Sequence, residues 1–124
     1  ILYNLTRRSV EFNLLPALRA RHVPVMAYSP VEQGKLVKHP QLAAIAKKRD
    51  ATAAQIALAW LLAQPEVIAI PKAGEVKHVE ENRAAADIEL TAAEIAALFQ
   101  AAGFKLTRVI HLAGGCSIVE GEPV

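Results

Sequence analysis

Two short apolar runs, at residues 23–28 and 67–70, are the clearest pattern in the chain. Each is stopped by a segment that contains proline, and such runs are typical of strands that are buried on both faces. Residues 1–3 resemble the end of a third strand of this kind. Because the sequence starts on Ile1 and its only methionine is Met26, we expect it to begin inside a domain.

Apolar residues at helical spacing fill the segments between the predicted strands. They predict helices at 12–18, 42–49, 52–64, 76–86 and 91–102. Two of these helices begin with a capping box, in which a threonine and the residue three positions later satisfy each other's backbone N–H groups. The boxes pair Thr52 with Gln55 and Thr91 with Glu94, and Gly103 is placed to end the last helix.

The order of these elements predicts an α/β fold. A strand, a helix, a strand, two helices, a strand and two helices imply a parallel sheet with right-handed crossovers. Three strands buried on both faces would leave open edges, whereas a closed barrel of about eight such units removes them. We therefore predict the last three strand–helix units of an incomplete (β/α)8 TIM barrel at residues 1–102. Residues 103–124 show no sustained period, and we expect an irregular tail there.

Composition and charge narrow the function classes. The chain has 124 residues, 53% of them hydrophobic and 21% charged, which is typical of a globular domain. Its formal net charge of +2 is small and its basic residues are scattered, which argues against a nucleic-acid partner. No apolar run approaches the roughly 20 residues of a membrane span, so we expect no membrane partner.

The single cysteine, Cys116, has no partner for an internal disulfide, and this predicts a reducing, cytoplasmic location. It is not a candidate nucleophile, because neither a histidine nor a predicted helix start lies beside it. His22, His39 and His111 have no partners at metal-ligand spacing. We therefore predict no metal site and treat these histidines as structural or exposed.

Candidate binding residues follow the last two predicted strands. In such barrels the functional face lies at the C-terminal ends of the strands, often with a phosphate site in the last two strand-to-helix loops. The first of these loops contains Tyr28, Ser29 and Gly34, which offer a ring, a hydroxyl and a close approach of backbone. The second places the charge of Lys72 beside a predicted helix start near Glu75. Together these groups favour a bound phosphate.

His78, Glu81 and Asn82 share helical spacing just beyond this helix start, so all three are candidates to face a bound nucleotide. The alternative is an ordinary solvated helix face, on which Glu81 and Asn82 bind water or cap locally. Arg7 and Arg8 follow the first strand on the same presumed face. Contact with substrate or phosphate is an alternative for these two arginines, which stay outside the predicted site.

Four short motifs in a fixed order connect these residues to a known family. They are AYSPV at 27–31, QIALAW at 55–60, IPKA at 70–73 and EN at 81–82. In this order and spacing, the chain resembles the aldo-keto reductases over residues 1–102. The resemblance implies the (β/α)8 barrel of that family and the NADPH-dependent reduction of an aldehyde or ketone, a small carbonyl substrate, to an alcohol.

The resemblance also implies roles for the residues after the middle strand. Tyr28 would stack on the nicotinamide ring of the cofactor. Ser29, Val31 and Gln33 would line its pyrophosphate. These four residues therefore belong to the predicted cofactor-binding site.

For the residues after the last strand, the resemblance implies contacts with the other end of the cofactor. Lys72 and Ala73 would hold the 2′-phosphate, and Glu81 and Asn82 would contact the adenine. Many family members have arginine where this chain has His78. The histidine is expected to bind the 2′-phosphate more weakly, or in a way that depends on pH. NADH therefore remains an alternative to NADPH, and His78 completes the predicted site.

The family's catalytic tetrad of Asp, Tyr, Lys and His belongs to the first half of the barrel, and no residue here is assigned to it. Both tyrosines, Tyr3 and Tyr28, lie in motifs that match later parts of the family pattern. We therefore expect this chain alone, the cofactor-binding part of the enzyme, to be inactive. A non-catalytic nucleotide-binding or interaction module is the alternative, and a tetrad in the preceding sequence would favour the enzyme.

Overall fold

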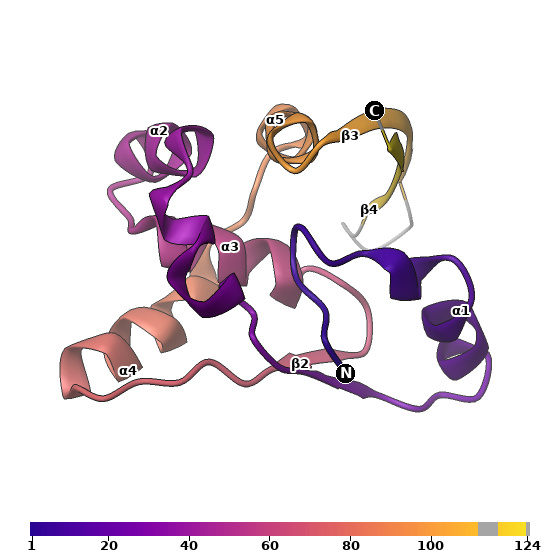
Figure 1. Ribbon diagram of the computed structural model, residues 1–124, viewed down its shortest axis with the longest axis horizontal. Coiled ribbons are helices and arrows are strands. Elements are labelled where there is room, and N and C mark those ends of the chain that lie inside the picture. The colour runs from indigo at the N-terminus through magenta and orange to yellow at the C-terminus, as the bar shows by residue number, and fades with distance from the viewer. Residues whose placement is uncertain (112–116, 124) are drawn as a thin grey trace.

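The helices and the two central strands follow each other in the predicted order (Figure 1). The computed structural model describes residues 1–111 and 117–123. The elements are α1 (Leu14–Arg19), β1 (Val25–Ala27), α2 (Pro40–Lys48), α3 (Ala53–Leu62), β2 (Val67–Ala69), α4 (Val76–Ala84), α5 (Ala92–Ala101), β3 (Phe104–His111) and β4 (Ser117–Pro123). Short 3-10 turns occur at Ser9–Glu11, Glu32–Gly34, Leu36–Lys38 and Ala85–Asp87.

The sheet is parallel, as the alternation of strands and helices predicts. β1 pairs with β2 in parallel, with Val25 opposite Val67. The start of the chain runs beside β1 in the same direction, because Leu2 bridges Tyr28 in parallel. At this bridge the backbone N–H of Tyr28 donates to the carbonyl of Ile1 at 2.9 Å. The predicted parallel pairing, with helices between the strands, is confirmed.

The two strands are buried on one face only. Val25 and Ala27 are buried, whereas Met26 between them is 56% exposed. Ile68 on β2 and Ile70 just after it are also about half exposed, at 49% and 45%. The prediction of burial on both faces is therefore wrong for the described residues, because the helices pack against a single side of the sheet.

α3 is the central helix of the core. It lies between the strands and α2 in Figure 1, and all of its residues from 56 to 61 are buried. Trp60 packs edge-on against Tyr3, with the ring centroids 5.7 Å apart. A helix enclosed on all sides needs no polar stripe, which explains why its sequence is apolar throughout.

Arg8 is a buried charge beside this core, 4% exposed. Its guanidinium carbon lies 3.7 Å from the ring centroid of Phe99 and 5.3 Å from that of Trp60. Its Nη2 atom donates to Glu11 at 2.6 Å. Stacking on aromatic rings and pairing with a carboxylate both offset the cost of burying a guanidinium. The burial of Arg8 therefore rules out the alternative that it contacts substrate or phosphate.

Both predicted capping boxes are confirmed. The N–H of Thr52 donates to Gln55 Oε1 at 2.8 Å, and the N–H of Gln55 donates to Thr52 Oγ1 at 3.2 Å. Thr91 and Glu94 make the same reciprocal pair at the start of α5. α5 ends as expected, because Gly103 follows it with a φ of 80°, in the left-handed region that glycine adopts without strain.

Glu94 also links α5 to α2. Its two carboxylate oxygens accept from Arg49 Nε at 2.8 Å and from Arg49 Nη2 at 2.6 Å. The hydrogen bonds from Arg49, together with those from Thr91, lower the pKa of Glu94 to about 2. Since this folded-state pKa lies below the ordinary value, the ionised pair stabilises the fold at neutral pH and is lost as the pH falls from about 4.5 toward 2.

We expect Glu94→Gln to lower the free energy of unfolding by about 1 kcal/mol at pH 6, because it keeps the cap and removes the ion pair. The difference from the unchanged chain should shrink between pH 4.5 and pH 2.5 as the unchanged Glu94 takes up its proton. Urea unfolding at several pH values measures both effects. Asp87→Asn, at an exposed pair with Arg83, is the control. A difference independent of pH would contradict the assignment.

α4 forms where a helix is predicted, and its face with His78, Glu81 and Asn82 borders the pocket. Two of its apolar residues, Val76 and Val79, are 75% and 56% exposed. No residue of α4 is buried, and the neighbouring turn contributes Ala85 to the core. Ala86, the last residue of the predicted helix, is also exposed. The physical reason is that the inward face of α4 borders a pocket and carries polar side chains.

The prediction of an irregular tail after residue 102 is wrong for the described residues. β3 and β4 pair as an antiparallel hairpin, with Val109 opposite Val119. The register shifts between Leu106 and Arg108, which leaves Thr107 as an extra residue in β3. Such a bulge breaks the alternation of apolar and polar positions. That break explains why the sequence shows no period of two.

Candidate functional site

A pocket of about 420 Å³ lies where the loop after β1, the start of α3, the loop after β2 and α4 meet. This volume is within the ordinary range for small-molecule sites. The lining includes five residues that the sequence singled out, namely Val31, Lys72, His78, Glu81 and Asn82. The remaining lining residues are Val37, Thr52, Ala53, Ala54 and Pro71.

Lys72 brings a positive charge to the pocket lining. Lys72 is exposed, and within residues 1–104 no carboxylate lies at ion-pair distance from its ammonium group. α4 begins after Glu75, whose side chain makes no capping hydrogen bond to the first turn. A lysine and a helix start without a side-chain cap, three residues apart in the sequence, each favour a bound anion.

The inward face of α4 is held by contacts along and across the helix. Gln55 Nε2 of α3 donates to the carbonyl of Glu81 at 3.1 Å. Lys77 Nζ lies 3.8 Å from Glu81 Oε1, one turn apart on α4. Since Asn82 also lines the pocket, α4 presents an amide and a carboxylate to any group that enters there.

The loop after β1 is strained. Ser29, Glu32 and Gln33 have φ values of 52°, 47° and 53°, in the left-handed region that residues other than glycine seldom adopt. Each such residue costs roughly 1–3 kcal/mol. Gly34 follows at 83°, where glycine is not strained. A loop of this shape persists only when the surrounding structure holds it.

Two residues from the start of the chain hold this loop. Asn4 Nδ2 donates to the carbonyl of Ser29 at 2.9 Å and to Glu32 Oε2 at 2.6 Å. Arg7 Nε and Nη2 both donate to Glu32 Oε1, at 3.0 Å and 2.9 Å. The hydrogen bonds from Arg7, followed by the one from Asn4, hold the pKa of Glu32 below its usual range. Glu32 is therefore an ionised anchor.

Four of the predicted site residues do not line the pocket. Tyr28 is 48% exposed at the end of β1, on the open side of the sheet. Ser29 and Ala73 are half-buried, and Gln33 is exposed. These four residues lie on the two loops that border the pocket. The structure therefore divides the predicted site into a pocket part and a loop part.

Sequence reasoning missed two groups of residues around the site. Ala53 and Ala54 line the pocket, although small apolar residues at a helix start carry no chemical signal. The capping box at Thr52 located this helix start, but nothing in the sequence placed it opposite Lys72. Asn4 and Glu32 were missed because their interaction joins segments 28 residues apart.

His22, His39 and His111 were predicted to be structural or exposed, and the prediction is confirmed for His22 and His39, whereas the side chain of His111 lies outside the described ones. His39 Nδ1 accepts from the N–H of Gln41 at 3.3 Å and so caps α2. His22 is exposed and lies 3.5 Å from Glu66. Among the described residues, no three His, Cys, Asp or Glu side chains gather as a metal site would require. Cys116 lies outside the described residues. In the described part of the chain, none of the helices has the length and apolarity to cross a bilayer.

The chain thus has an α/β fold with a pocket beside the carboxyl ends of its parallel strands, where such folds usually bind their ligands. Residues 1–102 match the model of the aldo/keto reductase family. The chain belongs to this family, and the resemblance stated from its motifs is confirmed.

Individual relatives agree with this assignment. The methylglyoxal reductase YeaE of Escherichia coli K12 is 41% identical over 106 residues, which cover 82% of this chain and 37% of YeaE. An aldo-keto reductase of Klebsiella pneumoniae, solved in complex with NADPH, matches with a TM-score of 0.77 and 41% identity over 81% of this chain and 37% of its own. The aldo-keto reductase Tm1743, solved with the inhibitor epalrestat, matches with a TM-score of 0.73 and 42% identity over 81% of this chain and 38% of its own. The chain therefore spans little more than a third of these relatives.

Proposed function

We propose that this chain is the cofactor-binding part of an NADPH-dependent oxidoreductase that reduces aldehydes or ketones to alcohols. In this proposal the chain forms the last three strand–helix units of a (β/α)8 barrel. The observation that carries it is the pocket in which Lys72 meets His78, Glu81 and Asn82 on the polar face of α4. The NADPH complex of the Klebsiella pneumoniae relative supports the choice of cofactor.

The pocket residues would bind the phosphorylated adenosine end of the cofactor. Lys72 offers a positive charge to the 2′-phosphate, next to the backbone of Ala73 and the N–H groups of α4. Asn82 has both a donor and an acceptor for the edge of the adenine, and Glu81 accepts from its amino group. His78 stands beside these groups at the pocket wall.

The loop residues would bind the rest of the cofactor. Tyr28, with half of its surface exposed at the strand end, presents a ring face to the nicotinamide. Ser29, Val31 and Gln33 line the path of the pyrophosphate. When bound, the cofactor supplies the hydride that reduces the carbonyl carbon of the substrate.

The proton for the carbonyl oxygen has no source among the described tyrosines. The hydroxyl of Tyr3 is buried and donates to Glu11 at 2.6 Å. Burial first, and then the negative charge of Glu11, raises the pKa of Tyr3 far above its usual range. Since Tyr28 is committed to stacking, the chain alone is expected to bind cofactor without turning over substrate.

Titration of the chain with NADPH and NADH tests this proposal. We expect NADPH to bind at least about tenfold more tightly, because charge-assisted contacts to a phosphate contribute about 1.5–3 kcal/mol. The enhancement of cofactor fluorescence or isothermal calorimetry measures both affinities. NADPH with methylglyoxal, the substrate named for the relative YeaE, should show no turnover. Absence of NADPH binding, or equal affinity for the two cofactors, would contradict the proposed role of the pocket.

A further inference from the structure

The loop between β1 and the pocket has no internal contacts that fix its position in the molecule. Its own hydrogen bonds are short turns, such as Glu32 N–H to the carbonyl of Ser29 and Gly34 N–H to the carbonyl of Val31, both at 3.0 Å. These bonds set the local curve of the loop. They do not determine where Val31 stands relative to the pocket that it lines.

Val31 packs against the hydrophobic core, and the polar part of the loop, at Ser29 and Glu32, is held by the segment that follows the first strand. Asn4 is fully buried, and its Oδ1 accepts from the N–H groups of Thr6 and Arg7, each at 3.0 Å. Its amide nitrogen is thereby aimed at the carbonyl of Ser29 and at Glu32 Oε2. Arg7 binds the other oxygen of Glu32. Each oxygen of one carboxylate is thus bound by a residue that is distant in sequence.

The side chain of Glu32 does not line the pocket, although its neighbour Val31 does. A free carboxylate on this loop would repel a dinucleotide phosphate. Here the charge of Glu32 is paired with Arg7 and is turned toward the start of the chain. The arrangement therefore uses a negative residue as an anchor and keeps its charge from the site.

We infer that Asn4, Arg7 and Glu32 form a clamp that holds the strained loop in the shape that receives the cofactor's pyrophosphate. This inference rests on the proposed function. In it, Glu32 is a positioning residue that acts through Ser29 and Val31 without touching the cofactor. Preorganisation of this kind lowers the cost of ordering the loop when the ligand binds.

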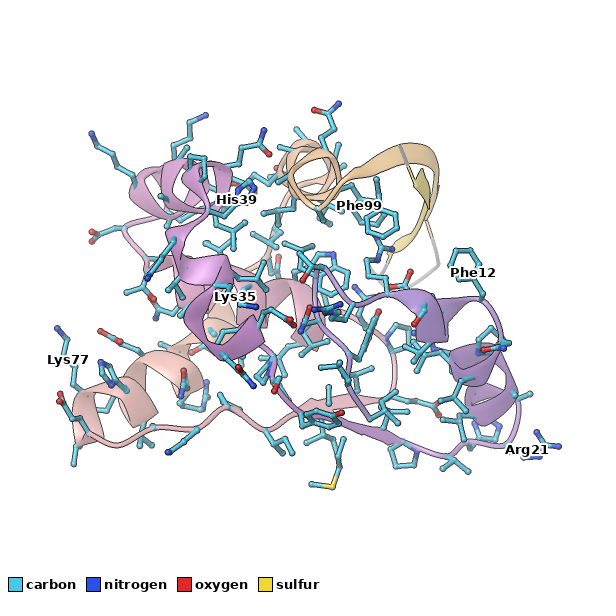
Figure 2. All side chains as sticks on the ribbon, in the orientation of Figure 1. Phe12, Arg21, Lys35, His39, Lys77 and Phe99 are labelled. Carbon is cyan, nitrogen blue, oxygen red and sulfur yellow. The ribbon has the colours of Figure 1, made fainter. Side chains whose placement is uncertain are left out.

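Three variants of the 124-residue chain test the clamp. Arg7→Ala removes the exposed partner, Glu32→Gln keeps an acceptor oxygen but removes the charge, and Glu32→Ala removes both. Arg21→Ala is the matched control, because Arg21 is exposed and bonds only within its own turn, far from the loop in Figure 2. The probes are NADPH, which spans loop and pocket, and 2′,5′-ADP, which needs the pocket alone.

We expect the dissociation constant for NADPH to rise about threefold in Arg7→Ala and Glu32→Gln and about tenfold in Glu32→Ala. The dissociation constant for 2′,5′-ADP should stay within about twofold, because Val31 is the only clamped-loop residue among 29–34 that lines the pocket and it contributes no polar contact there. Hydrogen exchange at residues 29–34 should become faster in the three variants and stay unchanged in Arg21→Ala.

The outcomes separate the clamp from a merely structural or electrostatic role. If Glu32→Gln and Arg7→Ala bind NADPH as tightly as the unchanged chain, or more tightly, the clamp is refuted. Equal losses for NADPH and 2′,5′-ADP, with a lower melting temperature, would also refute it. If Glu32→Ala does not fold, the other two variants decide. Failure of the unchanged chain to bind NADPH would instead overturn the proposed function, and the clamp's role in cofactor binding with it.

Discussion

Lys72→Met is expected to weaken NADPH binding by about 30-fold and to change NADH binding by less than about threefold. Lys72 is the exposed cation at the pocket, and no carboxylate in residues 1–104 competes for it. Only NADPH carries the 2′-phosphate that this ammonium group would neutralise. Methionine keeps the length and apolar stem of lysine, so the substitution tests the charge alone.

Titrations at low and high salt sharpen this experiment. The affinity for NADPH should fall with ionic strength in the unchanged chain, because salt screens an exposed charge pair, and should depend less on salt in Lys72→Met. Lys48→Met, at the exposed end of α2, is the matched control and should leave both cofactors unaffected. Parallel losses for NADPH and NADH would show that Lys72 supports the loop and does not bind the 2′-phosphate.

Trp60→Ala is expected to lower the free energy of unfolding by about 3–5 kcal/mol, the range for removing a large ring from a core. Trp60 is 1% exposed, and it packs against Tyr3 and beneath the guanidinium of Arg8. Its removal creates a cavity and takes one aromatic surface from a buried charge, which makes the loss larger than the lost area alone would suggest.

Urea unfolding followed by circular dichroism measures this effect, since Trp60 is the only tryptophan and the variant loses its fluorescence. Trp60→Phe keeps part of the ring and should lose less than half as much stability. Phe12→Ala removes a ring that is 71% exposed, whereas Phe99 is buried; Figure 2 labels both. This substitution should change the free energy of unfolding by less than about 0.5 kcal/mol. A loss below about 1 kcal/mol in Trp60→Ala would contradict the central place of α3.

Local signals predicted the helices of this chain well. The capping boxes at Thr52 and Thr91 marked two starts correctly, because such boxes depend on residues within one turn. Gly103 marked an end for the same reason. The positions of β1 and β2 also followed from the sequence. Their one-sided burial did not, since it depends on which neighbours cover Met26 and Ile68.

The candidate site was predictable where the residues carry a chemical signal. Lys72, His78, Glu81 and Asn82 do meet in one pocket, because the turn after β2 and the first turns of α4 keep them close in space. The alanines that complete the pocket carry no such signal. The Asn4–Glu32 contact was also beyond prediction, since it joins two loops through tertiary folding.

The hairpin and α4 show two ways in which a pattern misleads. In β3 a single extra residue, Thr107, shifts the register and hides a strand from a period-two search. In α4 the valines Val76 and Val79 have helical spacing but face solvent. Periodicity locates a helix whether its inward face meets an apolar core or a polar pocket. It identifies the inward face only when apolar packing, and not a polar pocket, lies on that side.

The two capping boxes differ in the second contact made by the residue three positions after the threonine. Gln55 uses its oxygen to cap α3 and its amide nitrogen to bind α4, whereas Glu94 caps α5 and uses its carboxylate to bind Arg49. Glutamine and glutamate are interchangeable for the cap itself. The choice between them is therefore made by the neighbouring element: a carbonyl requires a donor, and a guanidinium requires an acceptor. A motif that starts a helix thus also specifies the partner against which that helix is docked.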